Sequence, residues 1–88
     1  MGEQTTLDAI VRAELAIEIM KQARGLVSER VAAIEETDPA GAEALRAKRR
    51  ELLAVQNCIR VGDAEHIEAV IAEWGPRVKD AASFWREL

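Results

Sequence analysis

Side chains that could perform chemistry are scarce in this sequence. Cysteine and histidine occur once each, as Cys58 and His66, and tyrosine is absent. A catalytic thiolate needs a basic partner such as histidine, and a predicted turn separates these two residues. A metal site needs several converging ligands, whereas the carboxylates near His66 are scattered. We therefore expect no catalytic residues, no metal site and no cofactor, and interpret the chain as a protein other than an enzyme.

One basic cluster could contact phosphates. It consists of Arg46, Lys48, Arg49 and Arg50. On a helix, Arg60 shares a face with Arg46 and Arg50, and phosphate contacts supply most non-specific affinity for nucleic acids. The net charge of −4 argues against such binding, because nucleic-acid-binding domains are usually basic. Residues 1–40, 41–62 and 63–88 carry net charges of −4, +3 and −3, which favours pairing of the basic segment with its acidic neighbours.

The aromatic side chains are concentrated near the end of the chain. They are Trp74, Phe84 and Trp85, and there are no others. A separation of eleven residues returns Trp74 and Trp85 to nearly the same face of a helix. These rings either fill wide gaps in a core of smaller side chains or form an exposed anchor, since tryptophan is enriched at interface hot spots.

Two local signals divide the chain into predicted helices. Aspartate is a preferred N-cap and proline a preferred first helical residue, so Asp38-Pro39 marks a helix start. Gly62 suits the end of a helix and Asp63 can cap the next one. No segment shows the alternation of a strand. We predict helices over 6–36, 40–61 and 64–88.

The third predicted helix contains a glycine–proline pair. Its apolar positions run from Ile67 to Leu88 in alternating steps of four and three, and they keep their phase through Gly75-Pro76. Proline inside a helix removes one backbone hydrogen bond and usually kinks the helix. We therefore predict one continuous helix that is kinked at Gly75-Pro76.

The first predicted helix carries two apolar stripes. One has the spacing of a coiled-coil seam, and its members are Ile10, Ala13, Ile17, Met20, Arg24, Val27, Val31 and Ile34. The second lies almost opposite and consists of Val11, Leu15, Ile19 and Leu26. A surface helix normally has one stripe, so this helix needs two neighbours. A second copy of the chain would supply one of them in a symmetric homodimer, with Leu15, Ile19 and Leu26 in the interface. Coverage by the third helix would leave a monomer.

The whole sequence indicates one small helical domain over residues 1–88. The chain is 49% apolar and 32% charged, too apolar for disorder and too interrupted for a membrane span. A lone cysteine forms no disulfide within the chain and fits a cytoplasmic location. The predicted fold is an all-α three-helix bundle with an antiparallel, coiled-coil-like hairpin.

The function predicted from these patterns is protein–protein interaction. The chain would act as a non-enzymatic regulator, inhibitor or assembly factor, without a membrane, through a helical face. The candidate partner-binding residues are Leu15, Ile19, Leu26, Trp74, Phe84 and Trp85. The alternative function is that of a nucleic-acid-associated dimeric regulator that uses Arg46, Arg50 and Arg60.

Overall fold

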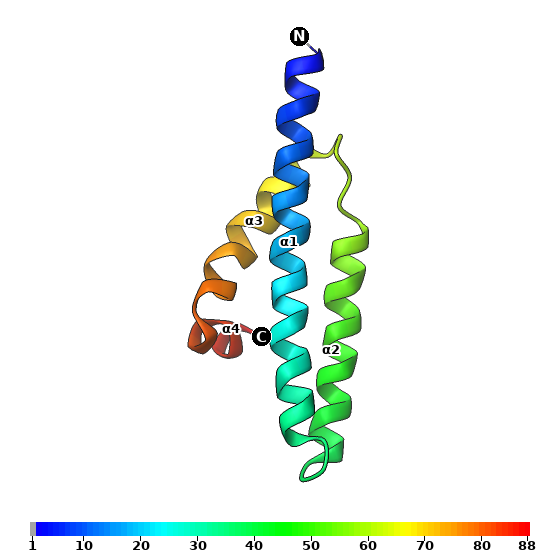
Figure 1. The fold of residues 1–88 in the computed structure, drawn as a ribbon, viewed down its shortest axis with the longest axis vertical. Coiled ribbons are helices and arrows are strands. Elements are labelled where there is room, and N and C mark those ends of the chain that lie inside the picture. Colours follow the sequence, from blue (N-terminus) through cyan, green and yellow to red (C-terminus); the bar gives the residue numbers. More distant parts are fainter. Residues whose placement is uncertain (1) are drawn as a thin grey trace.

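The computed structural model is an all-α bundle, as the periodicity predicts. It describes the backbone from Gly2 and the side chains from Leu7. The helices in this part of the chain are α1 (Gly2–Ile34), α2 (Pro39–Asn57), α3 (Ala64–Lys79) and α4 (Ala81–Glu87), and residues 2–88 form no strand. Figure 1 shows α2 on one side of α1, with α3 and α4 on the other. Residues 2–88 therefore form four helices where three were predicted.

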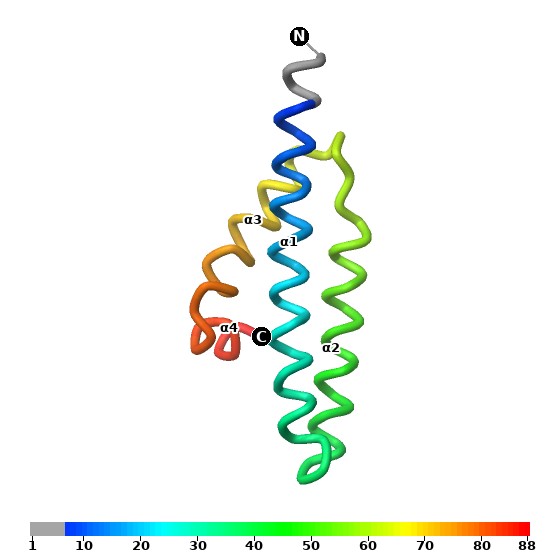
Figure 2. Tube along the Cα trace, viewed as in Figure 1, coloured from blue at the N-terminus to red at the C-terminus, as the bar shows by residue number. Residues whose placement is uncertain are grey.

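The first two helices form the predicted antiparallel hairpin (Figure 2). In the turn, the backbone N–H groups of Thr37 and Asp38 donate to the carbonyl of Ile34 at 3.1 and 2.7 Å. Asp38 then caps α2, because its Oδ1 accepts from the Gly41 N–H at 3.0 Å. Pro39 is the first helical residue and has no N–H that needs a partner. Together, these features satisfy exposed backbone groups at the end of α1 and at the start of α2.

The bounds of the first two helices differ from the predicted ones at several ends. Helix α1 begins at Gly2 rather than at residue 6, because no proline interrupts its first turns, and it ends two residues early at Ile34. Helix α2 ends at Asn57 rather than at 61. There, the backbone N–H of Cys58 donates to the carbonyl of Val55, and the backbone N–H of Ile59 donates to the carbonyl of Gln56. These bonds tighten the last turn. The chain then leaves the helical path, and the Ile59 side chain enters the core.

The predicted single helix over 64–88 is wrong in its second half. Helix α3 passes through Gly75-Pro76 as expected, but it ends at Lys79. Asp80 has an extended backbone, with φ −134° and ψ 103°, and its Oδ1 accepts from the N–H of Ala82 at 3.2 Å. This cap starts α4, so the break falls at Asp80, and Trp74 and Trp85 lie on different helices.

The core lies along one side of α1 and contains residues from every helix. Its most buried members are Ala13, Ala16, Met20, Ala23, Val27, Val31, Ala42, Leu52, Ile59, Ile67, Val70 and Phe84. The predicted seam is confirmed at Ala13, Met20 and Val27, whereas Ile10 is exposed. Ala16 and Ala23 are fully buried, and their small size allows the neighbouring helices to approach α1 closely.

Pro76 offers a direct test of how α3 is built. It lies inside the helix and is exposed, and it has no N–H to donate to the carbonyl of Ala72. We expect Pro76→Ala to restore this bond and to raise the free energy of unfolding by about 1 kcal/mol, partly offset by greater freedom in the unfolded chain. Urea denaturation followed by circular dichroism measures the change. A loss of about 2 kcal/mol would show that the proline stabilises a turn instead.

Candidate partner-binding surface

Helix α3 covers only part of the second stripe of α1. Ile19 is 7% exposed and lies beneath Gly75, where an added Cβ would sit 3.7 Å from Ile19 Cδ1. Leu26 is half-buried and Leu15 is exposed. The prediction of Ile19 as a partner-binding residue is therefore corrected, because α3 covers this side chain at Gly75. Leu15 remains available to a partner.

An apolar hollow separates α1 from α3 next to this contact. Its volume is about 480 Å³, and it is lined by Leu15, Ile19, Gln22, Ile71, Ala72, Gly75, Pro76, Val78 and Lys79. Ala72 and Gly75 contribute little side-chain volume to the α3 wall, so the space between the helices stays open. Gln22 and Lys79 are the polar residues in this lining. The hollow can therefore hold apolar side chains of a bound molecule.

Exposed apolar side chains lead along α1 into the hollow. Leu7, Val11 and Leu15 are 66%, 55% and 41% exposed, and their spacing of four residues places them along one side of the helix. Ile10 is exposed beside them. Isolated exposed apolar residues are ordinary, whereas a cluster marks an interaction site. We call Leu7, Val11, Leu15 and the adjoining hollow the α1–α3 surface.

An ion pair joins α1 to α3 beside this surface. Arg12 Nε donates to Glu68 Oε2 at 2.8 Å, and Arg12 Nη2 donates to Glu68 Oε1 at 2.6 Å. The hydrogen bond from Arg12 lowers the pKa of the Glu68 carboxyl, so both groups are charged at neutral pH. This bidentate pair holds the start of α3 against the exposed part of α1. The pair thereby positions one wall of a smaller hollow that includes Asp8 and Ala64.

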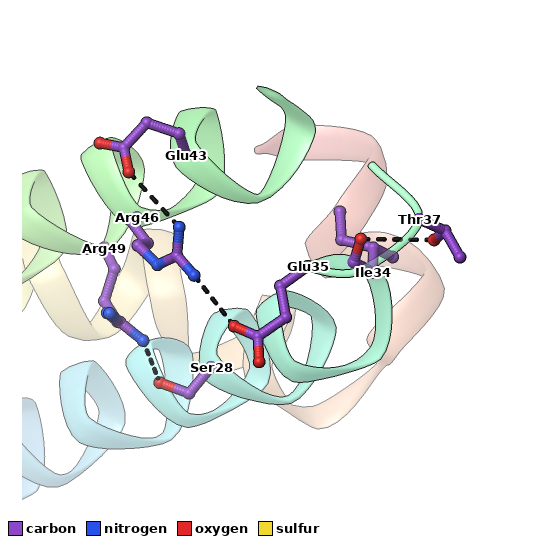
Figure 3. A network of polar contacts seen from close by, with 7 residues as sticks. All are labelled: Ser28, Ile34, Glu35, Thr37, Glu43, Arg46 and Arg49. Atoms are coloured by element: carbon purple, nitrogen blue, oxygen red, sulfur yellow. Dashed lines mark hydrogen bonds and ion pairs between the residues drawn. The ribbon is translucent and has the colours of Figure 1, made fainter. Parts of the chain in front are cut away.

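The basic cluster is largely occupied by contacts within the chain. Figure 3 shows Arg46 between two carboxylates, with Nη2 at 3.0 Å from Glu35 Oε2 and Nη1 at 3.4 Å from Glu43 Oε1. Arg49 donates to Ser28 Oγ of α1 at 2.9 Å. Of these contacts, only Arg46–Glu35 joins the basic segment to an acidic neighbour, because Glu43 lies within the basic segment itself and Ser28 is uncharged.

The remaining candidate arginines also bind groups within the chain. Arg50 Nη2 lies 3.5 Å from Glu43 Oε2. Arg60 donates to the backbone carbonyls of Asn57 and Ile59. A phosphate-binding face needs cationic groups directed outward, so the contacts of Arg46, Arg50 and Arg60 give the nucleic-acid alternative no support.

Phe84 belongs to the core, which corrects its prediction as a partner-binding residue. It is fully buried, and its ring centroid lies 5.1 Å from that of Trp85 and 6.3 Å from that of Trp74. The turn at Asp80 directs Phe84 inward. Both tryptophans are half-buried and are partly covered by cations, Trp74 by Arg77 and Trp85 by Arg30. Their predicted role toward a partner stays a prediction.

The lone cysteine and the lone histidine are not part of the α1–α3 surface. Cys58 is exposed just after α2, and the backbone N–H of His66 donates to the cap Asp63 at 3.2 Å. In the described part of the chain, no three histidine, cysteine or acidic residues are placed to hold a metal ion. No helix among the same residues has the length and apolar character needed to cross a membrane.

Sequence reasoning missed part of the α1–α3 surface. Leu7 and Val11 were not among the predicted partner-binding residues, although their spacing with Leu15 was a usable signal. The hollow itself had no such signal, because it depends on where Ala72 and Gly75 lie against α1. A comparison of the chain with protein-family models, curated proteins and solved structures finds no match.

Proposed function

We propose that this chain is a non-enzymatic protein–protein interaction module that binds another protein through the α1–α3 surface. Such a module acts as a regulator, an inhibitor or an assembly factor. A cytoplasmic location belongs to the same proposal, because an exposed thiol such as Cys58 stays reduced there.

The clustering of exposed apolar residues carries this proposal. Among the described residues, five large hydrophobic side chains are exposed, and four of them lie within residues 7–15 of α1. The hollow adjoins this cluster through Leu15, which belongs to both. Removal of apolar surface from water favours association, and a pocket that accepts a partner's side chain typically concentrates binding energy.

The homodimer predicted from the sequence would use the same surface. Its interface would then contain Leu15 but not the buried Ile19. Light scattering at micromolar concentration measures the mass directly. A value near 9.7 kDa indicates a monomer that is free to bind a different protein, and a value twice as large indicates a dimer.

Two matched variants test whether the α1–α3 surface binds a partner. Leu15 and Val61 are 41% and 42% exposed, but Val61 lies in the loop between α2 and α3. Because both side chains face water, we expect Leu15→Glu and Val61→Glu to change the free energy of unfolding by no more than about 0.5 kcal/mol. Leu15→Glu should weaken partner binding about tenfold or more, since it places a charge in an apolar contact.

Affinity capture from the cells that produce the protein, quantified by mass spectrometry, provides the measurement. Wild type and Val61→Glu should retain the same protein, and Leu15→Glu should lose it. Identical captures by all three forms would contradict the proposed surface.

A further inference from the structure

Acidic side chains border the exposed apolar stripe of the α1–α3 surface. Asp8 and Glu14 lie three residues before and after Val11, and Glu18 lies three residues after Leu15. This spacing places all three carboxylates beside the exposed apolar stripe. They are exposed, and Glu14 and Glu18 take part in none of the ion pairs between described residues.

Within residues 7–18, Glu14 and Glu18 have no free cation beside them, whereas Asp8 lies close enough to Arg12 to interact with its charge. Arg12 is the one basic residue in this stretch, and Glu68 holds its guanidinium by two hydrogen bonds. Positive charge appears only further along, where Lys21 is exposed and Lys79 lines the hollow. The exposed stripe is therefore acidic from Asp8 to Glu18, and the nearest lysines lie beyond it, at Lys21 and Lys79.

We propose that the partner presents an amphipathic helix whose apolar stripe is flanked by lysine or arginine. This inference rests on the proposed function and specifies its partner. The helix would lie along α1 with its basic residues beside Asp8, Glu14 and Glu18 and its apolar side chains on Val11, Leu15 and the hollow. The distance along α1 from Leu7 to Gln22 is about 22 Å at 1.5 Å per residue, so about four turns of the partner cover the surface. Regularly spaced apolar anchors of a helix fit such a groove.

A second copy of this chain fits the surface less well. In a two-fold pairing of α1 centred on Val11, the middle of the exposed stripe, Asp8 of one copy faces Glu14 of the other copy. Like charges placed opposite each other in an interface oppose association. A cationic helix on the same stripe forms opposite-charge pairs at these positions. The charge pattern therefore favours a basic partner of different sequence over self-association.

Synthetic helical peptides titrated into the full chain test this inference. One peptide of about four turns carries leucine at helical spacing flanked by lysine. The second replaces every lysine with glutamate, and the third keeps the lysine composition but shuffles the leucine spacing. Calorimetry measures the affinity of each peptide for wild type, for the Glu14→Lys/Glu18→Lys double variant and for Leu15→Glu, with Val61→Glu as the control.

We expect wild type and Val61→Glu to bind the lysine peptide about tenfold more tightly than either other peptide. The double variant should prefer the glutamate peptide, and Leu15→Glu should bind neither. Raising the salt to about 0.5 M should reduce the preference for lysine, because exposed charges are screened.

Four results would overturn the inference, and they separate it from the proposed function. Equal binding of the lysine and glutamate peptides, lost in Leu15→Glu, would reject a basic partner but keep the α1–α3 surface as a binding site. If the shuffled peptide bound as tightly as the lysine peptide, unspecific charge attraction would explain the binding. No peptide binding with a doubled mass would show that a second copy occupies the surface. If the chain were a monomer that bound no peptide, and if Leu15→Glu captured the same protein as wild type, both proposals would be rejected.

Discussion

Phe84→Ala is expected to lower the free energy of unfolding by about 3–5 kcal/mol, among the larger costs of a single core truncation. Phe84 is fully buried between the rings of Trp74 and Trp85. It also belongs to α4, which has only seven residues. A helix this short is not stable by itself in water, so its position depends on the side chain that it buries.

Urea denaturation monitored by circular dichroism measures this loss, and hydrogen exchange shows where it acts. The amides of α4 should exchange faster in Phe84→Ala than in wild type. Leu7→Ala is the matched control, because it also truncates a large apolar side chain but one that is 66% exposed, and it should cost about 0.5 kcal/mol or less. Similar losses in the two variants would mean that α4 is not docked through Phe84.

Met20→Ala is expected to cost about 2–5 kcal/mol, for a reason that concerns the bundle as a whole. Met20 is fully buried near the middle of α1 and belongs to the same cluster as Leu52 of α2 and Ile67 of α3. Removing its side chain leaves a cavity beside α1, the helix to which both α2 and α3 pack. Truncation should therefore loosen both contacts at once.

The same denaturation experiment tests this expectation with two control variants. Met20→Leu conserves the volume approximately and should cost less than about 1.5 kcal/mol. Ile10→Ala truncates an exposed position of the same seam and should cost much less than Met20→Ala. A cost for Met20→Ala no greater than that for Ile10→Ala would show that the seam is loosely packed and that α1 is not the centre of the core.

The sequence by itself determined that the chain folds into helices and where α2 and α3 begin. Asp38 and Asp63 accept hydrogen bonds from backbone N–H groups three residues further along, at Gly41 and His66. Such bonds form between near neighbours, so the sequence pattern alone indicates where α2 and α3 begin. The cap at Asp80 has the same local character, but the prediction followed the continuous apolar spacing through Pro76 and did not include this cap.

The sequence also determined which stripe of α1 forms the seam, because a spacing of three and four residues defines a helix face wherever the helix lies. It indicated less about Arg24, which interrupts this seam, and about Arg49 of α2. Each of these arginines has a polar partner on the facing helix. Arg24 donates to Gln56 Oε1 at 2.8 Å, and Arg49 donates to Ser28 Oγ. These pairings depend on the register between α1 and α2.

Only the tertiary structure decided what remains exposed. Ile19 and Leu15 look alike in sequence and lie on one stripe, but α3 covers the first and leaves the second open. The difference arises because Gly75 meets α1 at Ile19, and this contact joins residues far apart in the chain. Hydrogen bonds of caps and turns are local and therefore follow from neighbouring residues, whereas burial depends on how whole helices pack. The helical hairpin and the start of α3 could thus be predicted, and the α1–α3 surface that a partner would meet could not.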